Sequence, residues 1–191
     1  MPAPHFVSLE RLCELAHAGE AICFPTDTVP ALAALPRQAQ VVYELKRRSR
    51  DKPLAILAAN TESLQSYVLG WEAAWSRLAG RGWPGALTLV LPASAQVPAD
   101  AIARGSTVGV RVPDLAMARQ LLARTGPLVA SSVNLSGQAP LLNPVDIAAV
   151  FPQLPILQAE FPSARPPSTV MKWQSGHWEM VRQGAFVGPF Q

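Results

Sequence analysis

Residues 126–140 read GPLVASSVNLSGQAP, and the interpretation of the whole chain starts from this stretch. Its first part, residues 127–130, is apolar and predicts a short buried strand. Small polar residues then follow within seven positions: Ser131, Ser132, Asn134, Ser136 and Gly137. Their hydroxyl and amide groups can donate hydrogen bonds to a phosphate or a carboxylate at the end of a strand. A turn with a purely structural role has the same composition, so this stretch alone leaves both interpretations open.

The composition predicts a single globular domain over residues 1–191. The chain is 49% hydrophobic and 15% charged, which excludes a disordered protein. Its 19 prolines are scattered along the sequence, which favours short strands and loops over a long helical bundle. The net charge of +3 permits an anionic ligand or a nucleic acid without requiring either.

Cysteine and histidine usage predicts neither a disulfide framework nor a metal site. Cys13 falls in a helical pattern and Cys23 in a strand pattern, so both are expected to be buried free thiols. The three histidines do not lie at metal-ligand spacing with a cysteine or a carboxylate. We expect no signal peptide, and no apolar run approaches the ~18 residues of a membrane span, so a cytoplasmic location is expected.

Apolar periodicity and capping residues predict alternating helices and strands. Further strands are expected at residues 21–24, 54–58, 86–91, 107–112, 168–173 and 178–182. Helices are expected to start at Ser8, Gln38, Thr61, Trp71, Asp114 and Asn143, and to end near residues 19, 48, 69, 79, 123 and 151. Residues 152–167 are rich in proline and predict a loop. This order favours one α/β domain with a mixed sheet.

Two further segments place polar or charged residues beside strands. Thr26, Asp27 and Thr28 follow the strand expected at residues 21–24, where a capped turn is the alternative interpretation. Residues 46–52 read KRRSRDK and carry five cations in seven positions. This run is typical of a solvated helix end or a nucleic-acid patch, and it would also suit a phosphate clamp beside the strand at 54–58.

Arg111 is a charge within the apolar run TVGVRV at residues 107–112. A buried arginine is costly unless it is paired, so this side chain is expected to bind an anion. The alternative is an edge strand with Arg111 facing solvent. Neither a Walker A sequence nor a Gly-x-Gly-x-x-Gly fingerprint is present to explain a phosphate site.

Seven segments of the chain resemble the YrdC family, also called the threonylcarbamoyl-AMP synthase (TsaC) family, and they occur in the family's order. They are FPTDTV (24–29), ELKRRSRDKPL (44–54), WPGALTLVLP (83–92), TVGVRVPD (107–114), ASSVNLSGQAP (130–140), STV (168–170) and VRQGA (181–185). The resemblance implies a single YrdC-like domain: a twisted mixed sheet, largely antiparallel with parallel pairs, flanked by helices and bearing a positively charged concave surface.

The resemblance also implies a reaction. L-Threonine, bicarbonate and ATP, with Mg²⁺, give L-threonylcarbamoyladenylate and pyrophosphate, so the chain would be a nucleotidyltransferase. The product feeds the t6A modification beside the anticodon of tRNA, which implies tRNA, double-stranded RNA and other t6A-pathway proteins as partners to consider, and no membrane.

Matching motifs assign residues to this reaction. Thr28, Arg111 and Ser168 would bind threonine, and Arg111 would take its carboxylate in a bidentate pair. ATP would be held by Lys46, Arg48, Lys52, Thr107, Ser132, Asn134, Ser136 and Arg182. Lys52, Ser132 and Asn134 are expected to act on the reacting phosphate. Thr169 would help close the site, and no protein ligand for the metal is assigned.

Several positions depart from the family pattern. Pro30-Ala31-Leu32 stands where the family usually has Tyr-Gly-Leu, which removes an aromatic wall and a flexible glycine near Thr28. Val133 enlarges the usual alanine, and QAP follows Gly137 where Pro-Ser is common. We expect no extra C-terminal domain of the kind that longer relatives of the family carry. Two alternatives therefore stay open: an RNA-binding YrdC-like module, and a related carbamoyl-adenylate enzyme with an altered substrate.

Overall fold

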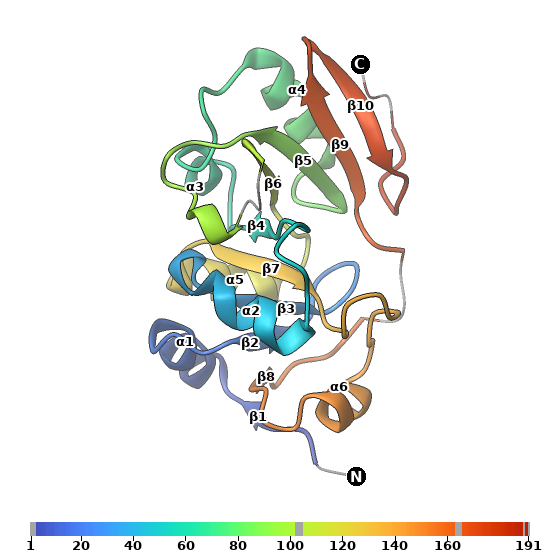
Figure 1. The fold of residues 1–191 in the computed structure, drawn as a ribbon. Helices are drawn as coiled ribbons and strands as arrows, with labels where there is room; N and C mark the ends of the chain where they lie inside the picture. The colour runs from blue at the N-terminus through green and yellow to red at the C-terminus, as the bar shows by residue number, and fades with distance from the viewer. Residues whose placement is uncertain (1–2, 102–104, 163–165, 189, 191) are drawn as a thin grey trace.

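A computed structural model describes residues 3–101, 105–162, 166–188 and 190. Within these residues a single mixed sheet runs from β1 at one end of the molecule to β10 at the other (Figure 1). In spatial order the strands are β1 (Phe6–Val7), β8 (Ile156–Leu157), β2 (Ile22–Phe24), β3 (Ala31–Ala34), β7 (Leu128–Ser132), β4 (Ala55–Leu57), β6 (Thr107–Arg111), β5 (Leu87–Pro92), β9 (Thr169–Gln174) and β10 (His177–Arg182). Five neighbouring pairs are antiparallel and four are parallel, which confirms the predicted mixed sheet.

One face of the sheet, here called the core face, is covered by four helices: α2 (Ala39–Lys46), α3 (Glu62–Gln65), α4 (Ala73–Gly82) and α6 (Pro144–Val150). Alternate side chains along each strand point into this layer. Leu87, Leu89 and Leu91 of β5 point into it beside Val108 and Val110 of β6. Because successive side chains of a strand point to opposite faces, the residues between them lie on the other face.

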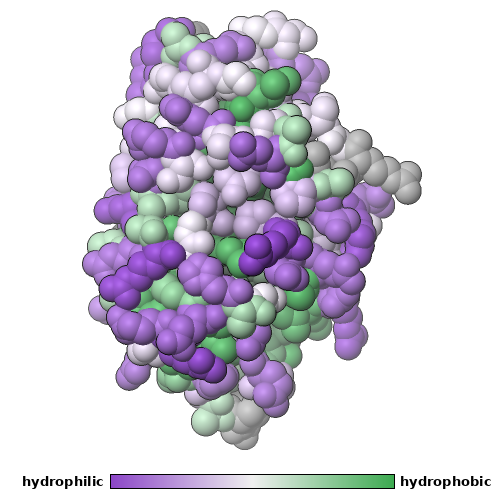
Figure 2. Space-filling model, turned by 90° about the vertical axis from the view of Figure 1, so that its left-hand side faces the viewer, coloured by the Kyte–Doolittle hydropathy of each residue, from purple (hydrophilic) through white to green (hydrophobic). Residues whose placement is uncertain are grey.

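The second face is only half covered. Helices α1 (Leu9–His17) and α5 (Ala116–Thr125) pack on β2, β3, β7 and β8, with Leu12, Leu121 and Leu128 at the centre of this smaller core. Leu57 of β4 also reaches this core, but no helix within the described residues packs on the same face of β6, β5 and β9. Figure 2 shows one side of the molecule, where hydrophilic side chains surround smaller hydrophobic areas.

Side-chain caps set the start of two helices as predicted. The Ser8 hydroxyl accepts a hydrogen bond from the Arg11 N–H at 3.2 Å, and Asn143 Oδ1 accepts one from the Asp146 N–H at 2.9 Å. Cys13 and Cys23 are buried free thiols, as expected. Thr61 occupies the predicted N-cap position of α3 but makes no capping hydrogen bond, since Asn60 accepts from the Ser63 N–H, and the helix ends at Gln65, earlier than predicted. The predicted cap at Asp114 is wrong.

Asp114 lies one residue before the N-cap of α5, which is Leu115. Its backbone N–H donates to Asp27 and its carboxylate accepts from Arg119, so Asp114 serves a tertiary contact. The predicted loop at 152–167 is wrong in part, because β8 lies within it. Strands β1 and β3 were not predicted either: β1 has two residues, and β3 reads ALAA, a composition with little intrinsic strand preference.

The end of α4 lies close against β5, and two glycines of this helix make a matched pair. A Cβ added at Gly82 would lie 2.7 Å from the Leu87 Cβ and 2.4 Å from its Cδ2, whereas one added at Gly80 would meet nothing within 4 Å. The close approach of α4 to β5 therefore requires glycine at position 82 but not at position 80.

We expect Gly82→Ala to lower the free energy of unfolding by about 1–3 kcal/mol through overpacking. Gly80→Ala, two residues earlier, should raise it by about 0.5–1 kcal/mol because alanine restricts the unfolded chain and favours the helix. Urea denaturation of both variants measures the difference. Equal effects at the two positions would contradict this packing.

Candidate functional site

A cavity of about 830 Å³ lies on the uncovered half of the second face. Its floor follows a row of register partners across five strands, β7, β4, β6, β5 and β9: Ala130 pairs with Ala55, Ala55 with Gly109, Gly109 with Val90, and Val90 with Lys172. All five line the cavity. The side chains in the middle of the row are small, because alanine and glycine leave the sheet backbone exposed, so the floor is flat there. The row ends at the cation of Lys172.

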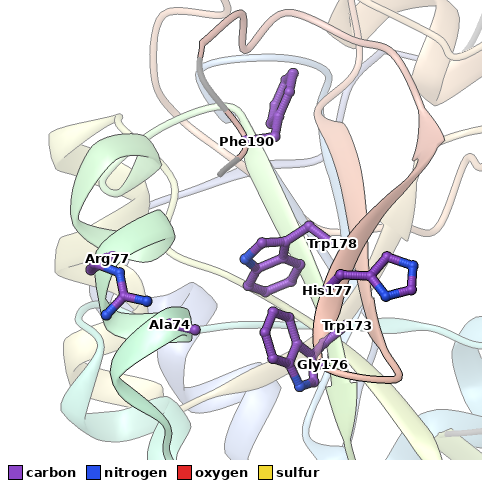
Figure 3. A pocket seen from close by; sticks show the side chains of 7 residues that line it. All are labelled: Ala74, Arg77, Trp173, Gly176, His177, Trp178 and Phe190. Atoms are coloured by element: carbon purple, nitrogen blue, oxygen red, sulfur yellow. The ribbon is translucent and has the colours of Figure 1, made fainter.

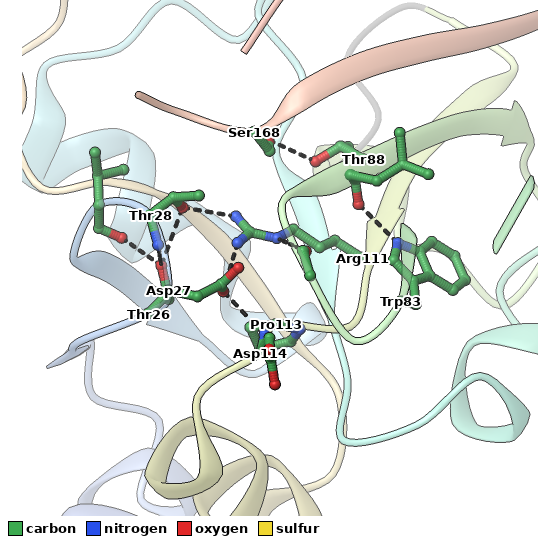
Figure 4. Close-up of polar contacts among 12 residues, drawn as sticks. Thr26, Asp27, Thr28, Trp83, Thr88, Arg111, Pro113, Asp114 and Ser168 are labelled. Carbon is green, nitrogen blue, oxygen red and sulfur yellow. Dashed lines mark hydrogen bonds and ion pairs between the residues drawn. The ribbon is translucent and has the colours of Figure 1, made fainter. Parts of the chain in front are cut away.

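A buried ion pair closes one side of the cavity (Figure 4). Arg111, at the end of β6, donates from Nη2 to Asp27 Oδ1 at 2.6 Å, from Nη1 to the Thr28 hydroxyl at 2.9 Å, and from Nε to the Gly85 carbonyl at 2.9 Å. Asp27 Oδ1 also accepts from the Asp114 N–H at 3.0 Å. The anion that the sequence predicted for a buried Arg111 is therefore Asp27, and the solvent-facing alternative is wrong.

The ion pair is almost fully desolvated. Arg111 and Asp27 are 6% and 9% exposed. Burial lowers the pKa of the Arg111 guanidinium, and the charge of Asp27 opposes this shift. Three of the five N–H groups of Arg111 are used within the protein. Its predicted bidentate pair with the threonine carboxylate therefore stays a prediction that must draw on the remaining donors.

The predicted phosphate loop is built around Lys46, whose side chain is fully buried. Its Nζ donates to the carbonyls of Ser132 and Asn134 and to Asn134 Oδ1, the latter at 3.0 Å. The Ser132 hydroxyl also donates to Asn134 Oδ1, at 2.6 Å, and the Ser136 N–H donates to the Lys46 carbonyl at 2.9 Å. Lys46 thus holds the loop in shape. Burial, with a smaller contribution from the charge of Arg48, lowers its pKa from 10.5 to about 8.

The basic run at residues 46–52 divides into three roles. Lys46 is buried in the loop contacts. Arg48 and Lys52 line the cavity, and Arg48 is fixed by hydrogen bonds to the carbonyls of Lys52 and Pro53, both at 3.0 Å. Arg50 points elsewhere and pairs with Asp100 at 3.0 Å on the surface. The run is therefore neither a uniformly solvated helix end nor a single patch.

A further part of the cavity wall comes from the strands β5, β9 and β10. The hydroxyls of Thr88 and Ser168 lie 2.8 Å apart, and Arg182 Nη2 donates to the Ser168 carbonyl at 2.8 Å. Thr169, predicted to help close the site, is fully buried and accepts from the Gly184 N–H at 2.9 Å. Thr169 therefore supports the wall from behind.

Most of the predicted site residues come together. Eight of them line the cavity: Thr28, Arg48, Lys52, Thr107, Arg111, Ser132, Ser168 and Arg182. Lys46, Asn134 and Ser136 are not among its lining residues and act through the loop. Pro30 and Ala31, the departures from the family pattern, line the cavity beside Thr28, and the Pro30 carbonyl accepts from the Val133 N–H at 3.2 Å.

Sequence reasoning missed two features of the site. Asp27 was noted as part of a polar cluster but was not recognised as the partner of Arg111. Lys172 was passed over, although the alternation of β9, with Met171 in the core and Val170 and Lys172 between core positions, signals that it faces the cavity. Alternation in the sequence could have found Lys172.

The described residues contain neither a metal-binding cluster nor a membrane-spanning helix. No group of three or more His, Cys, Asp or Glu side chains is placed to hold a metal ion in the part of the chain that the structure describes. None of the helices described there has the length and apolarity to cross a membrane.

A second hollow, of about 290 Å³, lies between α4 and the β9–β10 hairpin (Figure 3). Its lining is mainly aromatic and includes Trp173, Trp178 and Phe190. Among its described lining residues that are acidic, lysine or arginine there is only Arg77, so this hollow lacks the converging charges of the larger cavity.

The Asp27–Arg111 pair gives a stability prediction. Asp27→Asn leaves the Arg111 charge buried without a counterion and should lower the free energy of unfolding by about 3–5 kcal/mol. Asp114→Asn is the matched control, since it removes the same charge from an exposed ion pair and should cost less than about 1 kcal/mol. Chemical denaturation measures both, and equal losses would refute the burial argument.

The lowered pKa of Lys46 gives a pH prediction. Between pH 8 and pH 10.5 the unfolded chain keeps this proton while the folded protein releases it, so this residue makes the free energy of unfolding rise with pH. The free energy of unfolding of the wild type minus that of Lys46→Met should therefore increase with pH through this window and be constant below it. Denaturation curves at pH 7, 8, 9 and 10 test this, and a difference that shrinks with pH would contradict it.

Comparisons with known proteins agree with this geometry. The family model Sua5_yciO_yrdC, described as "Telomere recombination", matches residues 14–184. The chain is 32% identical over 186 residues to the threonylcarbamoyl-AMP synthase of Photorhabdus laumondii, covering 93% of this chain and 96% of that protein. It is 36% identical over 135 residues to the synthase of Bacillus subtilis, covering 68% of this chain but only 39% of the relative.

A solved structure, P. abyssi Sua5 complexed with L-threonine, superimposes with a TM-score of 0.85 at 29% identity. The match covers 93% of this chain and 55% of the Sua5 chain. The resemblance seen in the sequence is therefore confirmed over nearly the whole chain. This chain belongs to the Sua5/YciO/YrdC family.

Proposed function

We propose that this protein is an L-threonylcarbamoyladenylate synthase, a nucleotidyltransferase that forms threonylcarbamoyl-AMP and pyrophosphate from L-threonine, bicarbonate and ATP. One observation carries the proposal. A single cavity of about 830 Å³ joins a hydroxyl and guanidinium wall, formed by Thr28, Arg111 and Ser168, to a basic edge formed by Arg48 and Lys52. This volume is in the range of sites that enclose small-molecule ligands.

The proposed chemistry has two steps. The amine of threonine combines with bicarbonate to give a carbamate and water. A carbamate oxygen then attacks the α-phosphorus of ATP, and pyrophosphate leaves. Such a transfer depends on positioning and on cations that balance phosphate charge, with little covalent participation by the protein.

The residues divide between the two substrates. Thr28, Arg111 and Ser168 lie on one wall and would orient threonine. Arg48 and Lys52 would hold the triphosphate, and Thr107 and Arg182 would contact the rest of the nucleotide. Lys52 and the Ser132 hydroxyl are proposed to contact the reacting phosphate. Asn134 and Lys46 position Ser132 through the hydrogen bonds described above, so we now assign them a positioning role.

Mg²⁺ is proposed to enter with ATP. Mg²⁺ keeps most of its waters and usually takes one or two carboxylates together with substrate phosphates. Asp51 is the one carboxylate among the described residues that line the cavity, and it lies beside Lys52. Asp51 would be the protein ligand, and the ion would neutralise charge on the phosphates.

The product is proposed to serve t6A modification of tRNA in the cytoplasm, together with other proteins of that pathway. The RNA-binding alternative receives less support, because Arg48 and Lys52 line a cavity instead of an open surface. The altered-substrate alternative rests on Pro30 and Ala31, which line the cavity beside Thr28.

Pyrophosphate release from ATP and bicarbonate tests the proposal, with threonine, serine or no amino acid. We expect release that depends on threonine. Release with serine or another carbamoyl donor alone would support the altered-substrate alternative. Salt-sensitive RNA binding with no adenylate formed would support the RNA-binding module and reject the enzyme.

Two substitutions should separate the substrates. Arg111→Ala should weaken threonine binding and largely spare ATP, whereas Lys52→Ala should weaken ATP; losing a charged partner of a ligand typically costs ~2–5 kcal/mol. Because Arg111→Ala leaves Asp27 buried and unpaired, the Asp27→Asn/Arg111→Ala double variant is the folding control. Calorimetric titration measures both affinities, and unchanged threonine affinity would refute the role of Arg111.

A further inference from the structure

Lys172 is a cavity cation to which neither the motifs nor the proposed mechanism gives a role. It lies in β9, directly opposite Val90 of β5, at the end of the small-residue row that forms the cavity floor. The neighbouring residues Met171 and Trp173 pack in the core layer on the other face. The pleat of the strand therefore fixes the side to which Lys172 points.

Lysine usage in this chain is unusual. The sequence contains three lysines, Lys46, Lys52 and Lys172, against thirteen arginines. Lys46 is buried beneath the loop, and the other two both line the cavity. The two accessible lysine side chains of the protein thus face the same space.

The arginines of the cavity are already engaged by the protein. Arg111 binds Asp27, Arg48 binds the carbonyls of residues 52 and 53, and Arg182 binds the Ser168 carbonyl. Within the described residues, the ammonium groups of Lys52 and Lys172 make no hydrogen bond or ion pair. These two cations have donors to offer a ligand.

Glu179 is the natural competitor for Lys172, because it lies directly opposite on β10. Its carboxylate, however, lies 3.4 Å from His177 Nε2 on its own strand. No ion pair joins it to Lys172 among the described residues. The register alone therefore does not neutralise the Lys172 charge.

Position and chemistry indicate the ligand. Lys52 precedes β4, and β9 lies three strands away from β4, about 14 Å at the usual strand spacing. The floor between them, Ala55, Gly109 and Val90, is flat and carries no charged side chain that would compete with the two lysines for a phosphate. An ammonium is a compact charge with three donors, which suits the tetrahedral oxygens of a phosphate, whereas a planar carboxylate favours arginine.

We propose that Lys172 is a second phosphate-binding lysine of this cavity, and that Lys172 and Lys52 hold the phosphate groups of the nucleotide from opposite ends of the floor. The inference rests on the proposed function for its nucleotide. It adds Lys172 of β9 to Arg182 of β10, so that both strands of the β9–β10 hairpin contribute a cation to the nucleotide site.

The small number of lysines makes a direct test feasible. Reductive ¹³C-methylation labels lysine side chains and keeps their charge. Lys52→Arg and Lys172→Arg assign the two cavity signals in NMR spectra. Titration with Mg²⁺-ATP, with pyrophosphate and with adenosine should shift the Lys172 signal for the first two ligands and leave it in place for adenosine, which has no phosphate. The proposal would be overturned if the Lys172 signal did not shift with ATP or pyrophosphate, or if these ligands shifted it only in the Glu179→Gln variant.

Unlabelled variants give an independent readout. Lys172→Met should weaken ATP binding about tenfold, and Lys172→Arg should retain most of the affinity because it keeps the charge. Arg77→Met is the matched control: it removes one exposed charge at the other hollow and should bind ATP like wild type. Wild-type affinity in Lys172→Met would reject the role of Lys172.

The outcome also separates this inference from the proposed function. If threonine-dependent pyrophosphate release fails while ATP shifts the Lys172 signal, the synthase activity is rejected and the phosphate site stands. If release is normal while Lys172 does not respond, only the inference about Lys172 falls.

Discussion

The ion pair between Asp27 and Arg111 is the constraint on which the shape of the site depends. Through it, the loop after β2, the end of β6, the turn at residues 83–85 and the entry to α5 are bound to each other. These segments are up to 87 residues apart in sequence. A buried pair of this kind is weak support for stability, because desolvation offsets its attraction, but it strongly penalises any arrangement in which one partner is left alone. It therefore fixes one arrangement of loops around the cavity.

The same strands serve two purposes because their faces differ. One face of β5, β6 and β9 is packed with leucine, valine and methionine against α2 and α4. The opposite face carries Thr88, Thr107, Gly109, Arg111 and Lys172 at the alternating positions. The site is thus the surface of a rigid sheet whose back is a complete core. Substitutions on the cavity face can change the ligand with little effect on the packing behind it.

The sequence was informative where chemistry and periodicity were local. The ends of the strands, the caps at Ser8 and Asn143, and the need of a buried Arg111 for an anion were all predictable. What failed was non-local. Lys46 looked like a phosphate ligand beside Arg48, yet its partners are carbonyl and amide oxygens of Ser132 and Asn134, 86 and 88 residues away.

Of the three strands that escaped prediction, β3 and β8 did so for related reasons. β3 consists of three alanines and a leucine, and it is a strand because β2 and β7 pair with it on both sides. β8 has two residues within a proline-rich segment and is held between β1 and β2. Hydrogen bonding to neighbouring strands makes both segments strands, and the composition of a segment does not reveal its neighbours in the sheet. Arg111 shows the intermediate case: its need for an anion was visible, but not that Asp27 supplies it.

The β9–β10 hairpin meets α4 through an aromatic chain, part of which Figure 3 shows. Ring centroids of neighbouring tryptophans lie 5.0–6.5 Å apart along Trp83, Trp71, Trp75, Trp173 and Trp178. These are all five tryptophans of the sequence. Intrinsic fluorescence of this protein therefore comes from one coupled set of indoles that begins beside the turn holding Arg111 and ends on the hairpin. Its emission serves as a built-in optical signal for movement of the hairpin relative to the sheet.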